Sequence, residues 1–414
     1  MSTHDALLGL SPNDTQALCV PGFFLLFTTP VPTGFNDFLI EAEGFTPIPE
    51  ATRFTQNLWR DAAQSHVLGA PFIQAARLAR HPLGRIDLGE RKSSKPRHAD
   101  ICLMTHVAGV ALWAVWLPAP RQDFNPARWV EWLDINQEDS LAARIWHRLS
   151  PINQRITGIS GYGSYFPFSV IRLPDIELED WLEAHAEQVV SLLWRDRLTR
   201  PLKPDVVIDE LARDTCARVG GITLIGRRSA LDLHDRHDDS ATLEAEALEL
   251  APRSTLPFLI TLELLCIERA VLQSLYDRIT HTAPHSINDL LALKQDVMNG
   301  LEEYYGTTLA STRFNDVVAE DGEEMLGIVD LFDAVTDRLD MVSFSLTTNY
   351  QQRVTLLQFW LTVVFGATEI GFIAASIATW YYGTGLGLVL AWTVGATAVS
   401  ALILVALLRN KLAH

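Results

Sequence analysis

Hydrophobic residues gather at the C-terminal end of the chain in two long apolar stretches. They cover residues 354–382 and 386–408, and only residues 383–385 separate them. A helix needs roughly 20 mostly apolar residues to cross a bilayer, because hydrocarbon offers the backbone no hydrogen-bond partner. The pattern therefore predicts a transmembrane hairpin, in which the helices TM1 and TM2 are joined by a short outer loop.

A repeating apolar pattern precedes the first span. Its members recur at spacings of three and four, as in a helix with one apolar seam: Met325, Ile328, Phe332, Val335, Leu339, Val342 and Leu346. No proline lies between Met325 and Val354, and Gly327 is the only glycine there. We expect one unbroken stalk helix, starting near Gly322, whose seam packs on neighbouring helices or, alternatively, forms an ordinary core stripe.

The first 240 residues mix short apolar runs, rich in β-branched and aromatic residues, with helical stretches and Pro/Gly breaks. This pattern is typical of an α/β or α+β domain. The strand candidates are Leu18–Thr28, Ile101–His106, Gly109–Leu117, Ser169–Leu173 and Ile222–Ile225, and the helix candidates include Thr52–Leu78 and Glu177–Arg195. The basic segment Gly84–His98 lacks apolar periodicity and is interpreted as a solvated loop.

Long helical patterns with few breaks replace this mixture beyond residue 240. The predicted organisation is a cytoplasmic mixed α/β domain at 1–240, a helical and stalk region at 241–353, the two-helix hairpin, and a basic cytoplasmic tail at 409–414.

Polar residues also follow a regular spacing into the first span. Every seventh residue forms one line on a helix: Thr348, Thr355, Thr362, Glu369, Ser376 and Gly383. All but the glycine are polar or charged. Because each residue turns a helix by about 100°, this line lies roughly opposite the apolar seam.

A polar line inside a bilayer must face protein or water, and Glu369 is costly there unless it is hydrated, paired or neutralised. Neither span contains a basic residue that could pair with it. A water-filled pore would explain the line, and since one hairpin cannot enclose a pore, it requires a homo-oligomer. The alternative is a protonated Glu369 and hydroxyls that join helices or bond their own backbone.

The second span has a small face instead, with Thr393, Thr397 and Ser400 among glycine and alanine residues. Small residues permit close helix packing. We therefore expect TM2 to pack on TM1 as an outer layer.

Carboxylates line the stalk. Glu323, Asp330 and Asp337 recur every seven residues, and Asp333 and Asp340 lie beside them. Oxygen ligands suit divalent cations. A cation-sensing stripe and a solvated acidic face are both compatible with this pattern.

Other chemistry is poorly represented. A net charge of −17 argues against nucleic-acid binding, which needs a basic face. No phosphate-binding glycine motif or nucleophile elbow is present, so we expect no enzyme activity and no cofactor apart from a divalent cation. The four cysteines are widely spaced and are expected to be buried thiols in a reducing compartment. The cluster His234–Asp239 matches no metal motif and is interpreted as a surface loop.

The flanks of the spans indicate their orientation. The N-terminal residues Met1–Thr15 are polar and do not form an export signal. Arg353 precedes the first span, and Arg409 and Lys411 follow the second. By the positive-inside rule both termini are expected to be cytoplasmic, in a multi-pass protein of the cytoplasmic membrane.

The order of these parts, with an outer loop that begins Tyr382-Gly383, resembles the CorA superfamily of divalent-cation channels, including its ZntB branch. The resemblance implies a pentamer with a pore along the first span. In that family the loop usually reads Tyr-Gly-Met-Asn, and the Asn ring meets the hydrated ion. Here Thr384 and Gly385 replace Met and Asn, so the amide is missing and a Thr384 hydroxyl ring could take its place.

The sequence therefore leads to a homo-oligomeric divalent-cation channel or transporter, with Mg²⁺ as the first candidate ion. Alternatives are a ZntB-like Zn²⁺/H⁺ transporter, a regulated membrane effector that opens a nonselective pore when a small molecule or protein binds its cytoplasmic domain, and a nonconducting membrane-anchored sensor.

Overall fold

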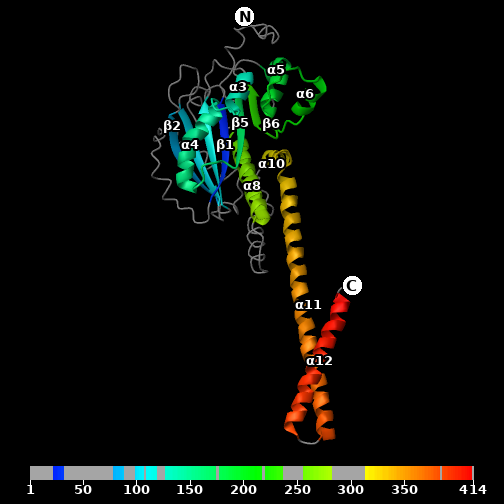
Figure 1. Cartoon of the computed structure of the whole chain (residues 1–414). Coiled ribbons are helices and arrows are strands. Elements are labelled where there is room, and N and C mark those ends of the chain that lie inside the picture. The colour runs from blue at the N-terminus through cyan, green and yellow to red at the C-terminus, as the bar shows by residue number, and fades with distance from the viewer. Residues whose placement is uncertain are drawn as a thin grey trace. The chain divides into compact units, whose positions relative to one another are not determined.

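A computed structural model describes residues 22–31, 78–87, 98–106, 109–118, 126–173, 177–216, 220–235, 255–281, 313–382 and 385–412. These residues fall into two compact units (Figure 1). The first unit contains the described residues up to Thr336, and the second contains those from Asp337 onward.

Seven strands of the described residues form one sheet in the first unit. They are β1 (Gly22–Pro30), β2 (Leu78–Asp87), β3 (His98–His106), β4 (Val110–Pro118), β5 (Ser164–Leu173), β6 (Gly221–Ile225) and β7 (Ala230–Asp235). The order across the sheet is β2-β3-β4-β1-β5-β7-β6. Neighbouring strands run antiparallel except β5 and β7, which are parallel, so the sheet is mixed.

The described helices are α3 (Pro126–Leu133), α4 (Leu141–Thr157), α5 (Leu178–Trp194), α6 (Pro204–Leu211), α8 (Leu256–His281), α10 (Arg313–Met325), α11 (Ile328–Tyr382) and α12 (Leu386–Leu412). The expected helix Glu177–Arg195 is confirmed as α5, with Glu177 and Arg195 as its caps. The mixed α/β fold class of this unit is likewise confirmed.

Strand β1 lies in the middle of the sheet, between β4 and β5, and all of its residues except Pro30 are buried. Its side chains alternate between the two faces of the sheet. On one face Phe23 meets the ring of Trp129 in α3 edge-on, with ring centroids 4.7 Å apart. On the other face Phe24 stacks on Phe168, which contacts Phe258 of α8 at 5.0 Å. The sheet is therefore covered on both faces, which explains the continuous apolar run of β1.

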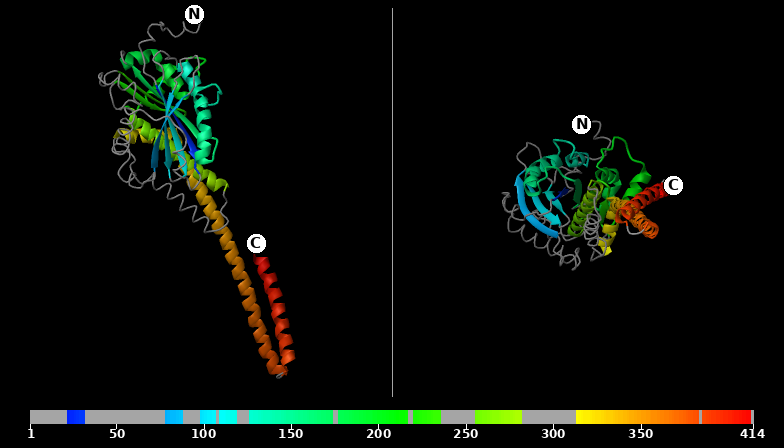
Figure 2. Two further views of the ribbon diagram at one scale, coloured as in Figure 1. Left: turned by 90° about the vertical axis from the view of Figure 1, so that its left-hand side faces the viewer. Right: turned by 60° about the horizontal axis from the view of Figure 1, so that its bottom comes forward.

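Helix α8 packs against β1 and β4, and α10 packs against α8. Both helices thus belong to the same compact unit as the sheet, whereas the sequence boundary at residue 240 separates them from it. The reason is the second apolar face of the sheet, which needs a covering helix. The two views in Figure 2 show α8, in yellow-green, beside the strands.

The predicted start of the stalk helix is wrong. Gly322 lies inside α10. The helix is interrupted at Gly327, which adopts a left-handed conformation (φ 66°) between α10 and α11. Left-handed glycine ends a helix because it lacks the β-carbon that would clash. From Ile328 onward the prediction of one unbroken helix is confirmed, since α11 continues for 55 residues to Tyr382.

Three further expectations about the first unit need correction or fall outside the described residues. The segment Gly84–His98 is not simply a loop, because Gly84–Asp87 ends β2 and His98 begins β3. The predicted helix Thr52–Leu78 lies outside the described residues except for Leu78, the first residue of β2. Strand β7 was not expected from the sequence, because it contains two aspartates and no long apolar run.

In the second unit, α12 runs back alongside α11, as Figures 1 and 2 show. The two helices are in close contact at Gly371, where an added β-carbon would overlap the Thr397 hydroxyl. The stretch Tyr350–Tyr381 is long and apolar enough to cross a bilayer, and Val389–Ile403 is a shorter apolar stretch. The expected packing of the small face of α12 on α11 is confirmed at Thr397.

Candidate functional site

The candidate pore face is the line of polar residues on α11. Thr355, Thr362, Glu369 and Ser376 are all exposed in the single chain. The buried residues of the same stretch are Val363, Ala367, Gly371 and Ala378. At about 100° per residue, the buried set and the polar line lie roughly on opposite sides of α11. The polar line therefore faces away from α12.

Several hydroxyls of this line bond their own helix. Thr348 donates to the carbonyl of Phe344 at 2.8 Å, and Thr362 donates to that of Gln358 at the same distance. Ser376 likewise donates to its own helix at 2.9 Å. These bonds satisfy the hydroxyl protons, as expected if the hydroxyls bond the backbone of their own helix. The hydroxyl oxygens keep lone pairs that can still accept from water or meet a cation.

Large apolar side chains surround the polar line on the remaining surface of α11 and α12. The most exposed include Phe365, Phe372, Trp380, Tyr381 and Leu402, which are 65%, 71%, 85%, 72% and 71% exposed. So many exposed large apolar side chains are unusual for a soluble helix pair and typical of contact with lipid or other protein chains. They supply a second reason, besides length, to expect a nonaqueous environment.

The loop between the helices is described only at its ends. Tyr382 is the last residue of α11, Gly383 and Thr384 lie outside the described residues, and Gly385 precedes α12. The Gly385 carbonyl accepts the first α12 bond from Val389 at 3.1 Å. A β-carbon on Gly385 would meet nothing within 4 Å. Packing against the described residues therefore does not require glycine at this position.

The acidic residues of the stalk divide into two groups. Asp330, Asp333, Asp337 and Asp340 are exposed on α11. Glu323 is not on this helix, because the break at Gly327 places it in α10, so the predicted seven-residue acidic repeat does not run along one helix. Among the residues described, no three His, Cys, Asp or Glu side chains gather as a metal site.

Glu323 instead belongs to a carboxylate cluster where α10 packs on α8. Burial, and secondarily the Glu323 charge, raise the pKa of Glu268 to about 8. Burial, followed by the charge of Glu320, also raises the pKa of Glu323. Proximity of like charges favours the protonated form. This cluster could not be read from spacing, because its members lie on separate helices.

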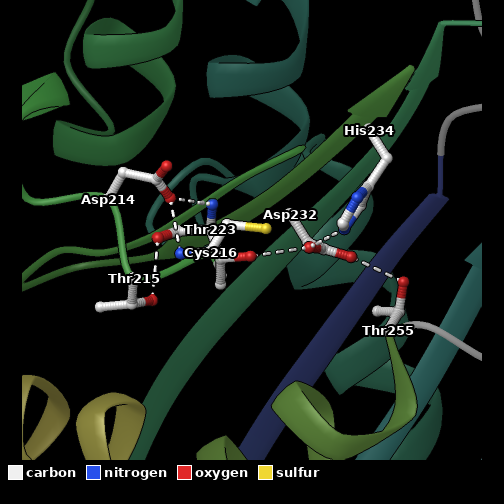
Figure 3. Close-up of polar contacts among 7 residues, drawn as sticks. All are labelled: Asp214, Thr215, Cys216, Thr223, Asp232, His234 and Thr255. Carbon is white, nitrogen blue, oxygen red and sulfur yellow. Dashed lines mark hydrogen bonds and ion pairs between the residues drawn. The ribbon is translucent and has the colours of Figure 1, made fainter. Parts of the chain in front are cut away.

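The predicted surface loop His234–Asp239 is wrong for its first two residues, and the other four lie outside the described residues. His234 and Asp235 are the last residues of β7, and His234 bonds the buried Asp232 at 2.7 Å (Figure 3). Asp232 and His234 lie two residues apart and so share one face of the strand. That alternation was the signal that the sequence analysis overlooked.

No family model, curated protein or solved structure matches this chain.

Proposed function

We propose that the chain forms a homo-oligomeric channel or transporter for divalent cations in the cytoplasmic membrane, with Mg²⁺ as the first candidate ion. In this proposal copies of α11 surround a common axis and α12 forms the outer layer. The resemblance to the CorA superfamily suggests five copies. The lipid bilayer and further copies of the chain would be its partners.

One observation carries the proposal. Glu369 is exposed on α11, on the side turned away from α12. A carboxylate at mid-span is costly in lipid and becomes acceptable when it lines a hydrated path. With Thr355, Thr362 and Ser376 in register, the same face offers a column of oxygen atoms, which are the ligands that hydrated divalent cations accept.

The exposed aspartates of α11 would form the cytoplasmic end of this cation path. Asp330, Asp333, Asp337 and Asp340 follow spacings of three and four, so they share one side of the helix. In an oligomer these carboxylates would attract cations toward the cytoplasmic end of the path. Binding of cations between neighbouring copies could also regulate conduction.

Cation flux into liposomes tests the proposal. The full chain is reconstituted with a Mg²⁺-sensitive dye inside the vesicles, and the Glu369→Ala variant is compared with Val364→Ala. Val364 is 56% exposed on a different side of α11. We expect flux with the unaltered chain, a severalfold change in rate or ion preference for Glu369→Ala, and little change for Val364→Ala. Equal flux and selectivity in all three chains would remove Glu369 from the path.

A regulated membrane effector is the second candidate. The observation that favours it is Gly385, which provides no selectivity amide although there is room for a side chain. Such a pore would pass monovalent ions and small dyes once a ligand or protein binds the α/β domain. Release of a small anionic dye together with Mg²⁺ would favour this function over selective transport.

A further inference from the structure

A second set of polar side chains lies in the first unit, at the hairpin of β6 and β7 and in the segments before and after it (Figure 3). Its centre is Asp232, which is 1% exposed. One carboxylate oxygen accepts from Thr223 at 3.1 Å and from Nε2 of His234 at 2.7 Å. The other oxygen accepts from Thr255 at 2.7 Å. The carboxylate is therefore held by three donors from different parts of the chain.

The Asp232 bond determines which nitrogen of His234 is available. Nε2 faces the carboxylate and carries the shared proton, which leaves Nδ1 as the basic nitrogen. A carboxylate behind an imidazole also stabilises the protonated ring. His234 can thus accept a proton at Nδ1 without leaving its position.

The thiol of Cys216 lies beside this nitrogen. A β-carbon on Gly221 would be 2.6 Å from Nδ1 of His234 and 2.8 Å from Sγ of Cys216. Both atoms therefore border the same small space, which exists because residue 221 is glycine. Cys216 is partly exposed, and the His234 side chain is 15% exposed, so small molecules in solvent can reach them.

The geometry points to Cys216 as a nucleophilic thiol that reacts with hydroperoxides, with His234 as its proton acceptor and Asp232 as a positioning residue. This site goes beyond the proposed ion passage and does not depend on it. Two further carboxylates lie next to these residues: Asp214 accepts from the N–H of Cys216, and Asp235 follows His234 on β7.

The reaction balances without a further reagent. The Cys216 proton moves to Nδ1 of His234, and the thiolate attacks one peroxide oxygen. An S–O bond forms while the O–O bond breaks, and the departing oxygen takes the proton from His234. Sulfur is oxidised by two electrons to a sulfenic acid, and the hydroperoxide is reduced to an alcohol, or to water when the reagent is hydrogen peroxide.

Acyl transfer is a poorer match to the same residues. Such a reaction needs backbone N–H groups aimed at a developing oxyanion. The N–H of Cys216 donates to the Asp214 carboxylate at 2.8 Å, and the N–H of Thr223 donates to the same oxygen at 2.8 Å. Those donors are occupied, so neither N–H group is available to an oxyanion. Oxidation of sulfur by a peroxide needs no such donors.

The test compares cysteines within one chain. The full chain in detergent is treated with hydrogen peroxide and then with dimedone, which traps sulfenic acids, and labelling of each cysteine is measured by mass spectrometry. Cys102 is partly exposed like Cys216 and serves as the matched control, while Cys266 is buried with its pKa raised to about 12. An ordinary thiol is only a few per cent ionised at neutral pH, so we expect Cys216 to label about five- to tenfold faster than Cys102.

Alkylation by iodoacetamide between pH 5.5 and 9.5 provides the second measurement. The unaltered Cys216 should keep most of its rate below pH 7, whereas His234→Gln should lose it and follow the profile of an ordinary thiol, with a midpoint near about 8.5. Circular dichroism verifies that the variant folds. Equal labelling of Cys216 and Cys102 would overturn the inference, as would an ordinary pH profile in the unaltered chain, which decides the matter even if His234→Gln does not fold.

Discussion

Gly371 of α11 lies directly against the Thr397 hydroxyl of α12, and a β-carbon on Gly371 would overlap that hydroxyl. Thr397 cannot easily turn away, because its hydroxyl donates to the Thr393 carbonyl at 2.8 Å. The carbonyl itself is 3.5 Å from the added carbon. The hairpin is therefore joined by a contact that permits no larger residue.

Replacing Gly371 by Val should separate the helices and lower the thermal stability of the detergent-solubilised chain. Overpacking of this kind costs about 1–3 kcal/mol. Gly395→Val is the matched control, since a β-carbon on Gly395 would meet nothing within 4 Å. The midpoint of thermal unfolding measures both variants. Equal loss of stability in the two would mean that helix propensity, not the contact, determines the effect.

Cysteine substitution can distinguish the polar face of α11 from the rest of its surface. Thr362 and Val364 are both exposed and two residues apart, so they point roughly in opposite directions. If α11 lines an aqueous path, a water-soluble thiol reagent should label Thr362→Cys and reduce flux, while labelling Val364→Cys slowly or not at all. Labelling is measured as the increment over the parent chain. Faster labelling at residue 364 would show that water contacts the side of α11 opposite the polar line, and would contradict the proposed path.

Stability of the first unit should fall as the pH rises from about 4.5 toward 8. Burial first, and then Glu323, raise the pKa of Glu268 from 4.5 to about 8. The folded state thus binds a proton that the unfolded chain has already released, and that stabilisation is lost as pH passes through the folded pKa. Urea unfolding midpoints at several pH values should show a smaller decline in Glu268→Gln than in the unaltered chain. Glu324→Gln, at an exposed position on α10, should behave like the unaltered chain.

The buried amide of Asn153 should be essential to the α4 side of the sheet. Its oxygen accepts from Trp113 at 2.9 Å and from Thr29 at 3.2 Å, and its nitrogen donates to the Ile159 carbonyl at 2.7 Å. Asn153→Ala would leave buried groups without partners at a cost of about 1–3 kcal/mol each. Asn136→Ala removes an exposed amide that donates to Asp134, and its urea midpoint should change little. A small effect at residue 153 would imply that water replaces the amide.

The sequence predicted those elements whose own pattern determines them. The central strand β1 was found because both of its faces are buried, which produces a continuous apolar run. The polar face of α11 was found because residues seven apart share one side of a helix as long as the helix is unbroken. Both signals are local and periodic, and neither requires knowledge of partners in the fold.

Features formed between distant segments were not accessible in this way. Asp232 accepts a hydrogen bond from Thr255, which lies 23 residues further along the chain. Glu268 and Glu323 interact only because α8 and α10 pack together. The break at Gly327 was missed for a different reason: one glycine near a helix start is compatible with either a continuous or an interrupted helix until its φ angle is known. Tertiary contacts decided the first two cases, and backbone conformation decided the third.

The strict seven-residue spacing of α11 also determines a handedness. A straight helix turns past a seven-residue repeat by about 20° each time, so a line of such residues slowly winds around it. Copies of α11 can keep Thr355, Thr362, Glu369 and Ser376 on a common axis only if they wrap around one another in a left-handed sense. In an assembly with straight pore helices, Thr355 and Ser376 would lie about 60° apart around each helix and could not both point at the axis.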